Sequence, residues 1–299
     1  MRREKGSILI ASLWMISIFA VFVSNLGFQS TQRAFLLKRE INNLEAQTAF
    51  LSALHLLAWD LASDPEPHED SAEDAWYGEV DLEDPWKTSL SLSVEDEESK
   101  INLNTASAAL LKVFLKRLDE EKGPLKGNAD DFVKQILTLR GKGKIGSFEE
   151  LFLFEDIEKE DAEKVRPYVS VFTDFPGINI NTASPLILKS FIDSVPGDHF
   201  AKEELFRKIM ERREQKDPKE GSGIFRSQEL TPNLFLSKLH LNPDVQMVQL
   251  ANQLVSYFTT DSKTYRLVME HKRSGKQAFC TIRDKPGLHA MEILSWHES

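Results

Sequence analysis

The sequence predicts an α+β protein with one very long N-terminal helix, an antiparallel sheet, and an all-α domain inserted into that sheet. An apolar run at the N-terminus continues into a helical pattern, and short alternating segments lie on both sides of the middle of the chain. The middle carries a repeated motif that opens helices. With 299 residues, 41% of them hydrophobic, the chain can bury one or two cores beside the long helix.

The first half of that helix is predicted to span a membrane. Residues 1–6 form a short leader with Arg2, Arg3 and Lys5, and residues 7–32 contain no charged side chain. As a helix, the apolar run of residues 7–28 would be about 33 Å long, enough to cross a hydrocarbon core of ~30 Å. Because positive charge favours the cytoplasmic side, we expect a single-pass topology with the N-terminus in the cytoplasm.

Residues 29–62 are predicted to be the amphipathic half of the same helix. Their apolar side chains recur three or four positions apart. We interpret them as one wide stripe that serves both the soluble head and neighbouring helices, with candidate partner contacts at Leu37, Ile41, Leu44 and Leu51.

Residues 63–100 are predicted to be an acidic connector with the first strands. Positions 60–98 contain fifteen Asp or Glu and a single Lys, which we interpret as a solvated surface, with an acidic contact face or a cation site as the alternative. Strands are expected over 76–82 and 86–94. Residues 241–299 are expected to form the C-terminal antiparallel sheet, starting with the run at 254–260.

The inserted all-α domain is predicted over residues 101–240. The sequence Ile-Asn-Leu-Asn-Thr-Ala-Ser of residues 101–107 recurs as Ile-Asn-Ile-Asn-Thr-Ala-Ser at 178–184, and each copy leads into two helices. The repeat units cover about 101–170 and 178–240. Asn and Thr oxygens suit a helix N-cap, so we predict caps at Asn104, Thr105, Asn181 and Thr182.

These repeats resemble the helix-hairpin-helix (SAM-like) unit of proteins that bind DNA through backbone phosphates. Such binding needs a glycine turn whose N–H groups form an anion nest. The segments between the helices carry acid instead, at residues 119–121 and at Asp198. Residues 101–170 hold twelve Lys or Arg against thirteen Asp or Glu, and the chain has a net charge of −10. We therefore expect no nucleic-acid partner.

No feature of the sequence indicates an enzyme. The seven His residues are scattered, and no metalloprotease, serine-hydrolase or phosphate-loop motif occurs. The lone Cys280 excludes an internal disulfide.

The whole chain resembles the minor pseudopilin K family of the bacterial type II (general) secretion system. The resemblance lies in the leader ending Lys5-Gly6, the apolar start with Leu13-Trp14, the helix of residues 33–60, the paired Asn-x-Asn-Thr-Ala units, and a C-terminal meander with Phe258, Arg266 and Trp296. It implies a type IV pilin-like fold in which a helical domain is inserted into the sheet.

The resemblance also implies a function. A prepilin peptidase would cleave after Gly6 and methylate Ser7, leaving the head in the periplasm and the chain anchored in the inner membrane. Most pseudopilins carry Glu at the fifth mature position, whereas this chain has Ala11. A carboxylate in hydrocarbon persists only when paired, and its absence is characteristic of the K member at the filament tip. The implied role is to initiate the pseudopilus and support protein export across the outer membrane. The implied partners are other minor pseudopilins, the inner-membrane secretion platform and exported proteins.

Calcium is a candidate ligand by resemblance, although no cofactor is required. Family members often have an acidic Asp-Trp-x-Asp stretch, but residues 136–141 lack it, and Asp130 and Asp131 lie just upstream. The metal ligands stay unassigned. Two other functions remain open, a membrane-anchored helix-hairpin-helix receptor for DNA uptake and a tip adhesin of a type IV pilus.

The leader leads to a first prediction. Cleavage after Gly6 should give a mature chain that begins at methylated Ser7 and stays in the membrane, because the apolar span follows the cleavage site. Mass analysis of the mature N-terminus checks this, and cleavage beyond about residue 25, as for a secretory signal, would contradict it.

Overall fold

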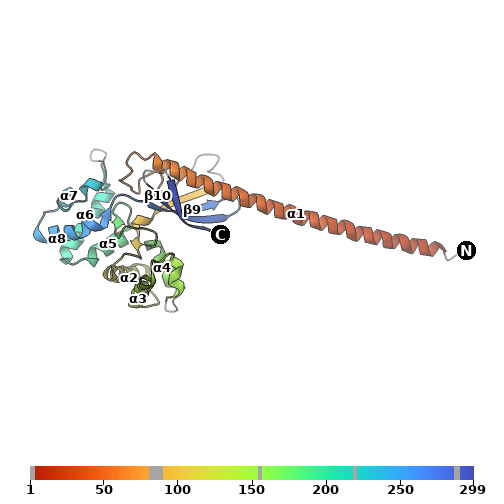
Figure 1. Cartoon of the computed structure of the whole chain (residues 1–299), viewed down its shortest axis with the longest axis horizontal. Helices are drawn as coiled ribbons and strands as arrows, with labels where there is room; N and C mark the ends of the chain where they lie inside the picture. The colour runs from red at the N-terminus through yellow and green to blue at the C-terminus, as the bar shows by residue number, and fades with distance from the viewer. Residues whose placement is uncertain (1–3, 81–89, 154–156, 218–220, 286–289) are drawn as a thin grey trace.

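The computed structural model describes residues 4–80, 90–153, 157–217, 221–285 and 290–299. Helix α1 (Glu4–Ala62) is one continuous helix of 59 residues. Its N-terminal part stands free, while its C-terminal part lies along a sheet, so the molecule is a head on a long stalk (Figure 1).

The sheet has five antiparallel strands in the order β1-β2-β9-β10-β11. They are β1 (Gly78–Glu79), β2 (Leu90–Asp96), β9 (Thr264–His271), β10 (Lys276–Lys285) and β11 (Ala290–Glu298). The C-terminal meander is confirmed for β9, β10 and β11. Before the insert, β1 is shorter than the strand predicted over 76–82, and β2 runs beyond residue 94. Residues 81–82 of the first predicted strand and 86–89 of the second lie outside the described part of the chain.

One face of the sheet is apolar and is covered by α1. Along β2, the buried side chains of Leu90, Leu92 and Val94 alternate with half-exposed ones, as expected for a strand with one solvated face. Cys280 of β10 is buried on the same face. Three of the five α1 residues buried in this core are alanines, whose small side chains let the helix backbone approach the strands closely. These contacts form the first hydrophobic core, to which α1 contributes Ala46, Ala49, Phe50, Ala53 and Leu57.

The helical insert lies between β2 and β9 and has a separate core. It folds as two repeats, each closed by a short parallel ladder. In the first, β3 (Ile101–Asn102) pairs with β4 (Val169–Ser170), and in the second, β5 (Ile178–Asn179) pairs with β8 (Phe258–Thr259). The first contains α2 (Ala108–Lys122), α3 (Ala129–Lys142) and α4 (Lys159–Val165), and the second contains α5 (Pro185–Ser194), α6 (His199–Glu214), the β6–β7 hairpin (Lys216–Asp217 with Gly221–Ser222), α7 (Pro232–Lys238) and α8 (Val245–Leu254).

The boundary predicted between insert and C-terminal sheet is wrong. The second repeat continues past residue 240 to Thr259, because its closing strand β8 must return to pair with β5. The run at 254–260, predicted as a sheet strand, is the end of α8, a 3-10 turn and β8. The first repeat ends in the same order. In both repeats a tyrosine before the closing strand packs on a phenylalanine, Tyr168 on Phe114 at 5.9 Å and Tyr257 on Phe191 at 6.2 Å between ring centroids.

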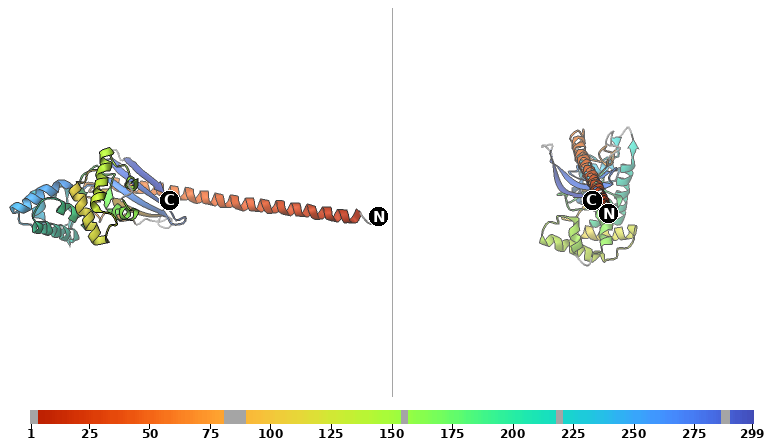
Figure 2. Two further views of the ribbon diagram at one scale, coloured as in Figure 1. Left: turned by 90° about the horizontal axis from the view of Figure 1, so that it is seen from below. Right: turned by 90° about the vertical axis from the view of Figure 1, so that its right-hand side faces the viewer.

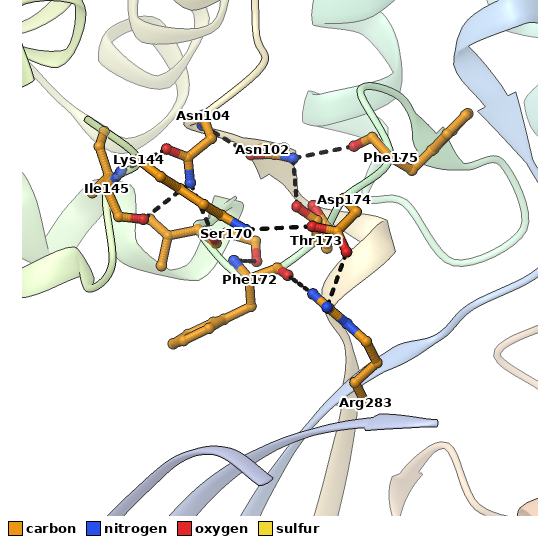
Figure 3. A network of polar contacts seen from close by, with 11 residues as sticks. Asn102, Asn104, Lys144, Ile145, Ser170, Phe172, Thr173, Asp174, Phe175 and Arg283 are labelled. Atoms are coloured by element: carbon orange, nitrogen blue, oxygen red, sulfur yellow. Dashed lines mark hydrogen bonds and ion pairs between the residues drawn. The ribbon is translucent and has the colours of Figure 1, made fainter. Parts of the chain in front are cut away.

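The motif asparagines tie each repeat together, and they do not cap helices. The Asn104 Nδ2 atom donates to the carbonyl oxygens of Ile145 and Val171 at 3.1 and 3.0 Å, and its Oδ1 atom accepts from the Ile145 N–H at 2.8 Å (Figure 3). In the second copy, the Asn181 amide bonds Phe225 in the same way, donating to its carbonyl oxygen at 3.0 Å and accepting from its N–H at 2.8 Å.

The predicted caps at Asn104, Thr105, Asn181 and Thr182 are therefore wrong. Helices α2 and α5 begin at Ala108 and Pro185 and are capped by Ser107 and Ser184, whose hydroxyl oxygens accept from the backbone N–H groups of Leu110 and Ile187. The motif as a whole still marks a helix start, since Ser closes both copies. The Asn104 and Asn181 amides link chain segments 41 to 111 residues apart, a role that sequence spacing does not reveal.

The two repeats occupy different places on the head. The second repeat, with α6, α7 and α8, lies at the end of the molecule farthest from the N-terminus (Figures 1 and 2). The first repeat lies beside the sheet, and its helix α2 packs against α5 of the second.

The motif contacts lead to a graded prediction. Replacing Asn181 with Ala should lower the free energy of unfolding by roughly 2–4 kcal/mol, because the backbone groups of Phe225 lose buried partners. Ser184→Ala should cost about 1 kcal/mol through loss of a cap. Thr105→Ala, at an exposed position, should be near neutral. Chemical denaturation of the full chain in detergent measures all three, and a Thr105→Ala cost equal to that of Asn181→Ala would refute this assignment.

Candidate assembly surface

The N-terminal part of α1 is an uncovered apolar rod. The helix contains an 18-residue window of mean hydropathy 2.1, none of it buried in the protein, which is long and apolar enough to cross a membrane. Ala11 lies in this part and is exposed. The backbone of Gly6 and Ser7 belongs to the first turns of α1, and the side chain of Ser7 lies outside the described part of the structure.

Beyond the span, α1 carries two apolar faces on opposite sides. The core contacts Ala46, Ala49, Phe50, Ala53 and Leu57 follow the helical period on one side. At about 100° per residue, a second set lies roughly 180° round the helix. Its members are apolar and exposed to between 54% and 72%: Leu37, Ile41, Leu44, Leu51 and Trp59.

The structure corrects the prediction of one shared stripe. Leu44 and Leu51 are 55% and 54% exposed and lie outside the core that α1 shares with the sheet. To that core the helix contributes three alanines, which a hydrophobicity pattern ranks low, together with Phe50 and Leu57. All four candidate partner contacts fall on the exposed face. We call this face the outer stripe, and it consists of Leu37, Ile41, Leu44, Leu51 and Trp59. An exposed apolar row of this length is typical of a surface that meets another protein or a membrane.

A buried polar junction holds the helical insert on the sheet. Asp96, at the end of β2, is fully buried and accepts hydrogen bonds from the hydroxyls of Thr182 at 2.5 Å and Ser262 at 2.7 Å. Asp70, in the connector, accepts from the Ser262 N–H at 2.5 Å. Glu98 accepts from the Thr264 N–H at 2.9 Å. The junction therefore joins the connector, both ends of the sheet's interruption, and the second repeat.

These carboxyl groups share a site with little water. Burial, together with the carboxylates of Asp96, Asp261 and Asp74, raises the pKa of Asp70 to about 8, even though the Ser262 N–H acts in the opposite direction. Burial raises the pKa of Asp96, and burial and the charge of Asp96 raise the pKa of Glu98 well above its usual value. With a pKa of about 8, Asp70 is mostly protonated at neutral pH.

The sequence interpretation of the acidic zone as solvated surface is wrong at this junction. Asp70, Asp96, Glu97 and Glu98 are buried, whereas Glu73 and other connector residues are exposed. The alternation of 89–94 into Asp96 was the available signal, because it continues the buried face of β2 onto a carboxylate. In the described residues, no group of three or more His, Cys, Asp or Glu is arranged to hold a metal ion, so the structure names no ligands for calcium.

Neither protein-family models nor curated proteins match this chain. Among solved structures, it is similar to a chain of the crystal structure of the GspK-GspI-GspJ complex from the type 2 secretion system of enterotoxigenic Escherichia coli. The TM-score is 0.61 at 13% sequence identity, over 90% of this chain and 99% of that one. The chain therefore shares the α+β fold of a component of that complex, with a long N-terminal helix, an antiparallel sheet and a helical insert.

The junction leads to a pH prediction. A folded pKa raised from about 3.8 to about 8 stabilises the fold fully below pH ~4, and this contribution is lost as the pH rises through ~8. The melting temperature of the full chain in detergent should therefore fall between pH 5 and pH 8, by about 2–4 °C for each kcal/mol lost. Asp70→Asn should flatten this dependence, while Glu73→Gln, at an exposed connector position, should keep it. An unchanged slope in Asp70→Asn would contradict the prediction.

Proposed function

We propose that this protein is a minor pseudopilin at the tip of a type II secretion pseudopilus, where it initiates assembly with other minor pseudopilins. The observation that carries the proposal is the shared fold over almost the whole of both chains, with a helical insert interrupting the sheet of a head on a long helix. The matched chain belongs to a complex named for three components, which supports other minor pseudopilins as partners.

The membrane span supports the tip position. Ala11 puts a methyl group where most pseudopilins have a carboxylate. Since a buried carboxylate in lipid needs a partner, that Glu serves a subunit with another subunit ahead of it. A subunit that starts the filament has nothing ahead of it and can carry Ala.

The position of the insert supports the same end of the filament. The second repeat extends the head beyond the C-terminal end of α1, away from the membrane (Figure 1). A further subunit stacked on that end would have to occupy the space of α6, α7 and α8. The junction that holds the repeat is buried, so the insert is a fixed obstacle and not a loose appendage.

The outer stripe supplies the surface for assembly. A filament of long helices needs an apolar face on each helix besides the one that packs on its own head, and α1 has one. The accompanying proposals are processing by a prepilin peptidase, association with the inner-membrane secretion platform, contact with exported proteins, and no catalytic role.

The hairpin segments of the insert favour this function over DNA uptake. In a phosphate-binding hairpin, the helix N-terminus after the turn is open to an anion. Here the Asp198 carboxylate caps α6 by accepting from the Ala201 N–H at 3.0 Å, and the first turn of α3 carries Asp130 and Asp131. No observation favours the pilus adhesin.

The experiment is to mix the full chain, in detergent, with the other minor pseudopilins of its system and to measure complex formation by analytical ultracentrifugation. The wild type should be monomeric alone and form a stoichiometric complex with them. Leu44→Asp would bury an unpaired carboxylate where the outer stripe meets a partner helix, and it should weaken the complex by about 100-fold or more. Because Leu44 is exposed in the monomer, the melting temperature should not change.

Lys38→Gln is the matched control. It changes the net charge by the same amount as Leu44→Asp, and Lys38 is exposed on α1 about 120° from Leu44. The control should bind as the wild type does. Open-ended polymers of this protein alone, or equal losses in both variants, would contradict the proposal.

A further inference from the structure

The last strand of the sheet has a free edge. β11 (Ala290–Glu298) is the end strand in the order β1-β2-β9-β10-β11, and β10 is its one partner strand among the described residues. We propose that β11 is a docking site for an extended segment of another protein, which adds to the sheet as a sixth strand with an acidic side chain facing the insert. This goes beyond the pseudopilus role and uses a different surface from the outer stripe.

The backbone of β11 is set up for such pairing. The backbone of Gln277 donates to Ser299 at 3.4 Å and accepts from it at 2.9 Å. In an antiparallel pair this pattern repeats every second residue, so the backbone N–H and C=O groups of His297 also point toward β10. By the same alternation, the N–H and C=O groups of Trp296 and Glu298 point away from β10. A row of unpaired N–H and C=O groups on an edge strand can form hydrogen bonds with the backbone of another strand. Natural proteins usually cover or interrupt such an edge.

A groove lies beside this edge. It has a volume of about 790 Å³ and is formed where the first repeat overhangs the face of β9, β10 and β11 that α1 does not cover. Phe172 and Val171 line it from the repeat, and Phe279 and His297 line it from the sheet. A bulge opposite Thr281 and Ile282 inserts Leu294 into the edge, and Leu294 also lines the groove.

The sheet residues that form the floor of the groove include a positively charged side chain, Arg266. One cross-strand row of the sheet consists of Arg266 on β9, Thr281 on β10 and Ser295 on β11. The side chains of Thr281 and Ser295 are short, so they leave space between the edge and Arg266. Arg266 forms no ion pair with a described residue, and its guanidinium lies 5.9 Å from the centre of the Phe279 ring. Its neighbour on β2, Glu95, is bonded to Lys100 at 2.7 Å. An acidic side chain on an added strand, opposite Ser295, would complement Arg266.

The other face of the edge selects apolar side chains. Ile293 is 52% exposed and is paired with the buried Ile282, so it points to the side of the sheet that α1 covers. Trp296, paired with the buried Cys280, lies on the same side. The added strand should therefore alternate apolar residues on the α1 side with polar residues on the groove side, one of them acidic.

A second copy of this chain does not fit the edge. An antiparallel β11–β11 pair has a two-fold axis normal to the sheet, and α1 lies along the sheet. Rotation by 180° about that axis reverses the direction of α1, so the two apolar spans would point in opposite directions and could not enter one membrane from the same side. The other edge strand, β1, has two residues against nine in β11, so we assign the edge to a strand of a different protein.

The test uses the full chain in detergent and a fluorescein-labelled nine-residue peptide of alternating threonine and valine with a central glutamate on the threonine face. Fluorescence anisotropy should show binding to the wild type. Glu298→Pro removes an outward N–H and should weaken binding about tenfold, while Glu298→Ala keeps the N–H and should change it less than about twofold. Melting temperatures confirm that both variants fold.

Charge and backbone are then tested separately. Arg266→Gln should weaken binding of the glutamate peptide by about fivefold and leave unchanged the weaker binding of a peptide with glutamine in that place. N-methylation of the peptide at alternate residues removes donors from one of its edges without altering the protein. Methylation of the residues whose N–H groups face β11 should abolish binding, and methylation of the residues whose N–H groups point away from β11 should leave it unchanged.

Three results would overturn the proposal. They are no binding by the wild type at millimolar peptide, equal losses in Glu298→Pro and Glu298→Ala, or a reversible dimer of this chain that Glu298→Pro dissociates. The last result would assign the edge to a second copy. None of them bears on complex formation through the outer stripe, so failure here is distinguishable from failure of the pseudopilus function.

Discussion

The buried Asp96 carboxylate is the contact on which the head's architecture depends. It ends the sheet strand β2, and it accepts hydrogen bonds from Thr182 in the second repeat and from Ser262, which lies just before the strand β9. A chain that leaves a sheet and returns more than 160 residues later needs both crossing points held together. Removing one partner from a fully buried carboxylate leaves an unsatisfied polar group, which is costly. The insert is therefore rigidly attached where it leaves and re-enters the sheet.

Two independent cores follow from this arrangement. The sheet and α1 bury one, and the repeats bury the other, with the polar junction between them. Additional fastening comes from Arg283 on β10, which donates to the Phe172 carbonyl oxygen at 2.5 Å and pairs with Asp174 at 2.9 Å (Figure 3). Polar contacts at the boundary fix the orientation of the two parts, which apolar contacts alone would leave free to slide.

The long helix shows how one element can serve two partners. Three of its alanines pack on the sheet together with Phe50 and Leu57, while Leu37, Leu44 and Leu51 face outward. Large apolar side chains usually lie in the protein's own core, so this exposed row is consistent with a helix that packs on other helices. The sheet edge at β11 offers a second, chemically different contact.

Much of the fold could be predicted from local pattern. Helix period, turn residues and strand alternation depend on neighbours in the chain, so α1, the meander and the repeated motif were visible in the sequence. The end of the second repeat was not, because β8 has only two residues and is defined by pairing with β5, about 80 positions earlier. The roles of Asn104 and Asn181 were missed for the same reason, since their partners are distant loops.

The sequence by itself determined the long apolar helix, the class of fold and the duplicated helical units, because each depends on a hydrophobic period or a recurring motif. Only the tertiary structure decided which face of α1 packs on the head, which acidic residues are buried, and which strand is left with a free edge. Burial of Asp70 or exposure of Leu44 depends on what the rest of the chain places against it. Composition and spacing carry no record of that placement.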